Sequence, residues 1–226
     1  MNIKYLVGAV ALTLASSATF AAATGASCKS TGSISWAAEL KIDGGTYDGG
    51  CKTYNGTSAL GDGSQGEAQK PYFRIMNGAT LKNVIIGKNG ADGIHSWYGG
   101  TLDNITWTDV GEDAFTLKKA GNVTLKNITT HLGTDKIIQQ NDTGTITVTN
   151  CIVDGAAKLY RQNGGKTWKA SINVSNCTLS NFTEGIFRTD GPQSTATLSN
   201  SRIHNTGTAC IGYTSGLCKL TNVTTF

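Results

Sequence analysis

An asparagine recurs at a nearly constant interval through most of the chain, and this period constrains the fold more than any other feature of the sequence. Seven segments place an apolar residue and one spacer before it, and the recurring residues are Asn83, Asn104, Asn127, Asn150, Asn176, Asn200 and Asn222. The successive intervals are 21, 23, 23, 26, 24 and 22 residues. A sustained period in this range predicts a solenoid in which each repeat forms one coil.

Composition decides which kind of solenoid the period describes. The chain has 29 Gly, 32 Thr and 17 Asn among its 226 residues, and all three are weak helix formers. Leucine-rich repeats need several Leu per repeat and usually a helical segment, whereas Thr, Val and Ile, which dominate these repeats, favour strands. Gly and Asn supply turn positions with positive φ. The sequence therefore predicts an all-β, single-domain, right-handed parallel β-helix of about seven to eight coils.

The aligned asparagines are expected to form a ladder of side-chain hydrogen bonds at one turn of each coil. The alternative is that an Asn followed by strand formers reflects only a turn that precedes a strand. Seven aligned copies favour the repeat.

The first 23 residues read as a secretory signal peptide. Lys4 precedes an apolar run at 5–14, and the small residues at 21–23 offer cleavage sites. The run is too short to cross a bilayer as a helix. We therefore expect a secreted, extracellular protein whose single domain is residues 24–226. The net charge of +4 includes no cluster of Lys or Arg, so we expect neither a nucleic-acid nor a membrane partner.

All six cysteines follow the predicted signal peptide. Export and an even count favour disulfides, and the lack of a CxxC pair argues against a zinc cluster. Cys151 and Cys177 each follow a recurring asparagine, so they should stack on neighbouring coils, about 4.8 Å apart and within the Cα range of a disulfide. The predicted pairs are Cys151–Cys177 in the middle, with Cys28–Cys51 and Cys210–Cys218 closing the two ends. In the alternative, the stacked pair are free core thiols.

The same alignment gathers charged residues on neighbouring coils. Asp92, Asp113 and Lys136 each lie nine residues after a recurring asparagine, and Glu112 and Asp135 directly precede the last two. Stacked like charges repel one another unless a cation lies between them, and oxygen ligands suit Ca²⁺. The four carboxylates therefore predict a calcium site. Without further information, Lys136 could simply neutralise Asp135 or Asp113 on a solvated face.

Several motifs resemble those of the polysaccharide lyase family 3 pectate lyases. They are 61–71 (GDGSQGEAQKP), 79–87 (ATLKNVIIG), 91–95 (ADGIH), 109–114 (DVGEDA), 134–136 (TDK) and 159–165 (LYRQNGG), and their order and spacing match the family. The likeness runs from about Gly44 to the C-terminus. The resemblance implies a secreted, calcium-dependent enzyme that folds as a compact right-handed β-helix without an added binding module. It also implies cleavage of polygalacturonate by β-elimination, which yields unsaturated oligogalacturonides.

The resemblance also assigns roles to individual residues. Lys136 matches the lysine proposed as the base that removes the C5 proton, and Arg161 matches the arginine that steadies the substrate carboxylate. Glu67 matches a further acidic residue of the active site. The metal ligands implied are Asp92, Glu112, Asp113 and Asp135. A lysine base must lose its proton, so we expect the pKa of Lys136 to fall from about 10.4 under the influence of Ca²⁺ and Arg161. An alkaline activity optimum with a calcium requirement follows.

Two other kinds of β-helix protein compete with this interpretation. A polygalacturonase hydrolyses its substrate with paired carboxylates, and such enzymes resemble one another in an Asn-Thr-Asp, Asp-Asp and Gly-His-Gly series that this chain lacks. A noncatalytic adhesin or carbohydrate-binding protein would explain the solenoid. It would not explain the match of Glu67, Lys136 and Arg161 to a lyase pattern. We expect a monomer whose partner is polygalacturonate or pectin.

Overall fold

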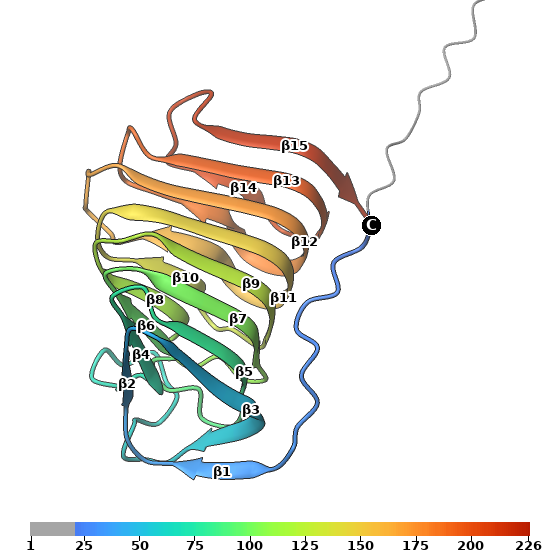
Figure 1. The fold of residues 1–226 in the computed structure, drawn as a ribbon. Coiled ribbons are helices and arrows are strands. Elements are labelled where there is room, and N and C mark those ends of the chain that lie inside the picture. Colours follow the sequence, from blue (N-terminus) through green and yellow to red (C-terminus); the bar gives the residue numbers. More distant parts are fainter. Residues whose placement is uncertain (1–20) are drawn as a thin grey trace, which may run out of the picture.

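Residues 21–226 are described by a computed structural model, so positions 1–20 of the predicted signal peptide lie outside the described residues. The predicted parallel β-helix is confirmed, because the strands of the described chain pair in parallel and form one solenoid of about eight turns (Figure 1). No helix in this part of the chain could cross a membrane. The strands are β1 (Ser33–Trp36), β2 (Leu40–Asp43), β3 (Thr46–Gly56), β4 (Phe73–Met76), β5 (Thr80–Ile86), β6 (Ile94–Trp97), β7 (Gly100–Trp107), β8 (Asp113–Lys119), β9 (Val123–His131), β10 (Lys136–Gln140), β11 (Gly144–Gln162), β12 (Ala170–Arg188), β13 (Thr195–His204), β14 (Thr208–Ile211) and β15 (Cys218–Thr225).

Each coil contributes to two faces of the solenoid. The asparagine face consists of β1, β3, β5, β7, β9, the first parts of β11 and β12, β13 and β15. The acidic face consists of β2, β4, β6, β8, β10, the last parts of β11 and β12, and β14. The 19-residue strands β11 and β12 bend through both faces, so each pairs with neighbours on both.

The recurring asparagines bend the strands of the asparagine face at one aligned position. All seven adopt positive φ between 48° and 60°. Asn tolerates this left-handed conformation better than most residues because its short amide side chain can hydrogen-bond locally. The flanking residues pair in register from coil to coil, for example Val84 with Ile105 and then Ile105 with Ile128. The coil period predicted from the sequence is therefore the period of the structure.

The side-chain ladder forms at some of the steps between coils. Asn104 donates to Asn83 at 2.8 Å, and Asn150 donates to Asn127 at 2.8 Å. Asn222 donates to Asn200 at 3.1 Å. Asn127 instead donates to Asp103 at 2.7 Å, which interrupts the run.

The segment between Thr24 and Cys28 runs along the bends rather than around a coil, and we call it the strap (Figure 1). The Thr24 amide donates to Asn150 Oδ1 at 2.8 Å, and the Ser27 amide donates to Asn104 Oδ1 at 2.7 Å. The strap thereby satisfies asparagine oxygens on coils that are not adjacent to one another.

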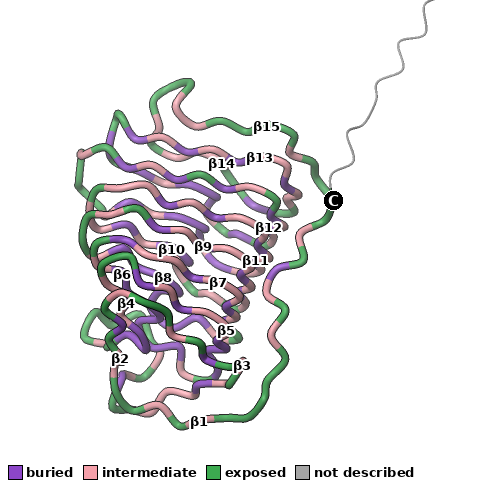
Figure 2. Tube along the Cα trace, in the orientation of Figure 1, coloured by how far each residue is buried: buried purple, intermediate pink, exposed green. Residues whose placement is uncertain are grey.

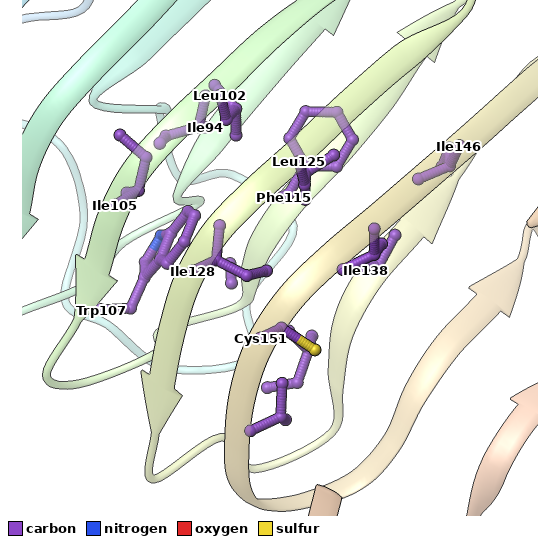
Figure 3. Packing of buried hydrophobic residues seen from close by; sticks show 14 of the residues in the cluster. Ile94, Leu102, Ile105, Trp107, Phe115, Leu125, Ile128, Ile138, Ile146 and Cys151 are labelled. Carbon is purple, nitrogen blue, oxygen red and sulfur yellow. The ribbon is translucent and has the colours of Figure 1, made fainter. Parts of the chain in front are cut away.

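Apolar side chains from both faces fill the interior in columns. Leu81, Leu102 and Leu125 align on successive coils of the asparagine face, and all three are fully buried. Ile94 and Phe115 enter the same core from the acidic face (Figure 3). Buried positions lie within the stack, while exposed ones gather at turns and at the first and last coils (Figure 2). A single coil cannot cover such a column, so the coils are stable only as a stack.

All three predicted disulfides are confirmed. The Cα–Cα distances are 5.3 Å for Cys28–Cys51, 4.5 Å for Cys151–Cys177 and 6.1 Å for Cys210–Cys218. No cysteine is free, so the alternative of free core thiols is wrong. The central pair stacks in register directly after two recurring asparagines, as the alignment requires.

Substitution of Asn104 separates the two contributions of a recurring asparagine. We expect Asn104→Gly to lose only the side-chain hydrogen bonds, because Gly adopts positive φ without steric cost. Asn104→Ala also places a Cβ in the left-handed region, so it should destabilise the protein by about 1–2 kcal/mol more than Gly. Urea unfolding of both variants measures the difference. Equal loss of stability in the two would show that backbone conformation at this bend carries no cost.

Candidate active site

The acidic residues predicted from the alignment lie where the chain enters the acidic face. Asp113 is the first residue of β8, and Glu112 directly precedes it. Asp92 occupies the position equivalent to Asp113, in the turn before β6, because Ile94 pairs with Phe115. The turns approach closely, since the Glu112 amide donates to Ala91 O at 2.6 Å. Gly111 permits this approach, because a Cβ there would lie 2.2 Å from the same oxygen.

Three of the four predicted metal ligands come together. Asp92, Glu112 and Asp113 offer carboxylate oxygens that all lie within 4.8 Å of one another, and each residue is at most 6% exposed. Asp92 Oδ1 is buried and has no hydrogen-bond partner in the described chain. An unpartnered buried carboxylate oxygen is costly unless a cation or donor satisfies it. The donor set therefore fits a hard divalent cation such as Ca²⁺.

The Lys136 ammonium lies at the edge of this group. Its Nζ is 3.0 Å from Glu112 Oε1, 3.1 Å from Asp113 Oδ1 and 3.2 Å from Asp135 Oδ2. Burial lowers the pKa of Lys136, but the charges and hydrogen bonds of Asp113 and Glu112 outweigh burial and raise the pKa above its ordinary value. The fall in pKa expected from the sequence therefore requires another cation to neutralise these carboxylates.

The three carboxylates differ in their electrostatic environments. Burial raises the pKa of Asp113 well above its usual range and also raises that of Glu112, against the opposing influence of Lys136. For Asp92, burial likewise raises the pKa, but His95 at 2.8 Å and Lys118 at 3.5 Å outweigh it, so the net pKa is lowered. Asp92 is therefore the carboxylate of the group whose ionised form the protein favours most.

Asp135 occupies a different position from the other predicted ligands. Its Oδ1 lies 2.5 Å from Lys158 Nζ, while its Oδ2 faces Lys136. Burial raises the pKa of Asp135, but the two lysines outweigh it and the net pKa is lowered. Lys158 also reaches Glu184 Oε2 at 2.8 Å. Asp135 thus holds two lysines on adjacent strands, and the structure does not group it with the three-carboxylate set.

Sequence reasoning missed Lys158, although its position in the repeat, one coil after Lys136, could have indicated it. Lys158 pairs in register with Lys136 across β10 and β11. It lies eight residues after Asn150 rather than nine, so a fixed offset from the asparagine passes over it.

Arg161 lies on β11, the strand next to β10, and pairs in register with Gln139. Its guanidinium donates to both carboxylate oxygens of Asp190, at 3.1 and 2.7 Å. Asp190 also accepts the Gly165 amide at 2.7 Å, and these donors lower its pKa. Asp190 therefore fixes the orientation of Arg161, a partnership that no sequence motif indicated.

Glu67 comes from the long turn between β3 and β4 and is exposed. It lines a cavity of about 640 Å³ to which Asp92 also contributes, whereas Glu112, Asp113 and Lys136 do not line it. The cavity continues past Asp92 to Arg74 and Trp97 at the N-terminal end of the acidic face. The predicted site residues thus lie along one side of the solenoid.

The chain is similar to known proteins in both sequence and fold. A family model described as pectate lyase matches residues 24–219. A probable pectate lyase E of Neosartorya fischeri is 36% identical over 150 residues, which is 65% of this chain and 59% of that relative. The chain thus spans less than two thirds of the length of the curated relatives that it matches.

Two solved structures have a fold similar to that of this chain. The catalytic domain of pectate lyase PelI from Erwinia chrysanthemi superposes with a TM-score of 0.63 at 24% identity, covering 84% of this chain and all of that one. PelI in complex with tetragalacturonic acid superposes with a TM-score of 0.61 at 25% identity, covering 85% of this chain and 70% of that one. Because the family model covers most of its length, the chain belongs to the pectate lyase family.

Proposed function

We propose that the protein is a secreted, monomeric, calcium-dependent pectate lyase that cleaves polygalacturonate by β-elimination. One observation carries the proposal: the Lys136 ammonium contacts a buried three-carboxylate group, while Arg161 lies on the neighbouring strand. Family membership and a related structure that holds tetragalacturonic acid support the same substrate class. Three disulfides are consistent with an oxidising extracellular compartment.

Asp92, Glu112 and Asp113 are the residues that would hold Ca²⁺. When bound, the ion would supply positive charge where the substrate carboxylate gains electron density as the C5 proton leaves. The same carboxylates would then no longer favour the protonated form of Lys136. Asp135 contacts Lys136 from outside the three-carboxylate group, and we assign it the role of holding Lys136 and Lys158 in place rather than that of a fourth ligand.

In this mechanism the neutral amine of Lys136 accepts the C5 proton. The electrons of the C5–H bond form the C4–C5 double bond as the C4–O bond breaks, and the departing oxygen takes a proton from a water molecule of the solvent. Arg161 uses two of its nitrogens on Asp190, and its remaining N–H groups can donate to a substrate carboxylate. Its orientation is fixed before the substrate arrives, which favours productive binding. Glu67 would face the substrate from the turn that lines the cavity.

Replacement of Lys136 tests its role as the base. Lys136→Arg keeps a cation among the carboxylates, but a guanidinium does not deprotonate in this pH range. We expect it to lower turnover on polygalacturonate by about 10²–10⁴-fold, measured as ultraviolet absorbance of the unsaturated product. Lys126→Gln is a matched control, because Lys126 pairs with Asp103 on the asparagine face. If Lys136→Arg retained most of its turnover, Lys136 could not be the base.

The same assay distinguishes the competing functions of the wild-type protein. New reducing ends without ultraviolet absorbance would indicate hydrolysis. Absence of cleavage with and without Ca²⁺ would favour a noncatalytic carbohydrate-binding protein.

Calcium binding can be tested without an activity assay. Because a ligand stabilises the state that binds it, Ca²⁺ at about 100 times its Kd should add about 2.7 kcal/mol, or about 5–10 °C in Tm for a domain of this size. Asp113→Asn should abolish the shift, and Asp135→Asn should keep it. The control Asp103→Asn, on the asparagine face, should also keep it. A full shift in Asp113→Asn would contradict the assigned site.

A further inference from the structure

One row of residues crosses six neighbouring strands of the acidic face, with one member on each. Register pairing aligns Arg74, His95, Thr116, Gln139, Arg161 and Arg188 on β4, β6, β8, β10, β11 and β12. The residue before each of them is an inward-facing apolar side chain, such as Phe73 or Phe115. Because neighbours on a strand point to opposite sides, the row lies on the outer side of the sheet, where His95 and Thr116 are covered by other side chains and Arg74 and Arg161 are half-buried. Arg74 lies at one end of these six strands, and Arg161 and Arg188 lie at the other, with no arginine or lysine between Arg74 and Arg161. Beyond Arg74, the register continues to Lys41 on β2.

Arg74 at the N-terminal end of the row is held on two sides. Its Cζ lies 4.3 Å from the ring centroid of Trp97, so the guanidinium stacks on the indole. Its Nε lies 2.6 Å from Glu39 Oε1. Its side chain is 19% exposed, and within residues 21–226 its Nε is buried without a well-aligned hydrogen bond. A preoriented, partly exposed guanidinium is suited to binding a carboxylate.

Arg74 and Trp97 also line the cavity that reaches the candidate active site. Glu39 neutralises Arg74, and Asp92 lies near Lys118. The remaining charged residues lining the cavity are Glu67, Lys70 and Lys119, and neither lysine forms an ion pair within the described chain. The cavity lining thus carries a small excess of positive charge.

We propose that Arg74 and Trp97 form a second uronate-binding site, at which Arg74 binds a sugar carboxylate and Trp97 packs against the sugar ring. The site rests on the proposed function, and it adds a preference for substrate length. Four strand spacings separate the strand of Arg74 from that of Arg161, which is about 19 Å. An oligomer must therefore extend over about 19 Å to engage both arginines, which requires several linked sugars.

Simultaneous binding to Arg74 and Arg161 should favour long substrates over short ones. A charge-assisted hydrogen bond contributes about 1.5–3 kcal/mol, which corresponds to tenfold or more in affinity. An oligomer too short to span the row gains nothing from the second site. The preference for hexagalacturonate over trigalacturonate, expressed as the ratio of their kcat/KM values, therefore reports on the site.

The experiment compares Arg74→Gln and Trp97→Leu with a matched control. Arg202 also stacks on an aromatic ring, with its Cζ 4.6 Å from the centroid of Phe226, but it lies on β13 of the asparagine face. We expect Arg74→Gln to reduce the preference for hexagalacturonate about tenfold, and Trp97→Leu to reduce it in the same direction. Arg202→Gln should leave the preference unchanged. An unchanged preference in both site variants would overturn the proposal.

A double variant and a binding measurement test the proposal even if Arg74→Gln folds poorly or turnover is absent. If Arg74→Gln folds poorly, the double variant Glu39→Gln/Arg74→Gln replaces it, because it does not leave Glu39 as a charge without its partner. We expect the double variant to show the same loss of preference for hexagalacturonate. Calorimetric titration of hexagalacturonate and trigalacturonate measures the length preference in binding, independently of turnover. If the wild-type protein cleaves neither oligomer, the proposed function fails, and the titration still decides the binding site. Equal affinity for both oligomers would overturn the site.

Discussion

The left-handed bend at one asparagine per coil is the constraint on which the rest of the structure depends. Once Asn83, Asn104 and Asn127 occupy equivalent positions, the strand residues that follow them at equal distances lie above their counterparts in the coil below until the register shifts. The apolar columns, the central disulfide and the acidic group all follow from that alignment. Small departures in coil length matter for the same reason, because an inserted residue moves the side chains that follow it.

Stacking also brings the like charges of the candidate site close together, so they need a cation nearby. Parallel coils place equivalent side chains about one strand spacing apart, so acids on successive coils repel one another. In this protein the nearest counter-charge is the ammonium of Lys136, which contacts both Glu112 and Asp113. One lysine therefore stabilises the acidic group in the arrangement described here and is also the group proposed to accept a proton. Lys136 stabilises Glu112 and Asp113 only when it is protonated, and it can accept a proton only when it is neutral. Its protonation state is therefore linked to whether another cation is bound by these carboxylates.

The alignment of the sequence was sufficient to predict the fold, the central disulfide and the proximity of Asp92, Glu112 and Asp113. The other two disulfides were predicted from the remaining cysteines near the two ends of the chain. The alignment was not sufficient for contacts that depend on side-chain direction or on irregular coils. Asp135 turns toward Lys158, which a fixed nine-residue offset passes over because the segment from Asn150 to Lys158 is one residue shorter than the segment from Asn127 to Lys136. Asp190 reaches Arg161 from a turn in the next coil, and nothing in its local sequence identifies that partner. The raised pKa of Lys136 depends on three-dimensional distances to several acids, and sequence spacing does not supply those distances.

The strap alters how a solenoid of this kind would lose its structure. In a repeat protein each coil contacts only its neighbours, so a stack can fray from one end while the remainder persists. Hydrogen bonds from the strap to Asn104 and Asn150, together with the Cys28–Cys51 bridge, join coils that are separated along the stack. Loosening of one of these coils then removes contacts from the others. The strap therefore extends cooperativity beyond nearest neighbours, and because Asn150 follows Thr24 by 126 residues, it can dock only after most of the coils have been synthesised.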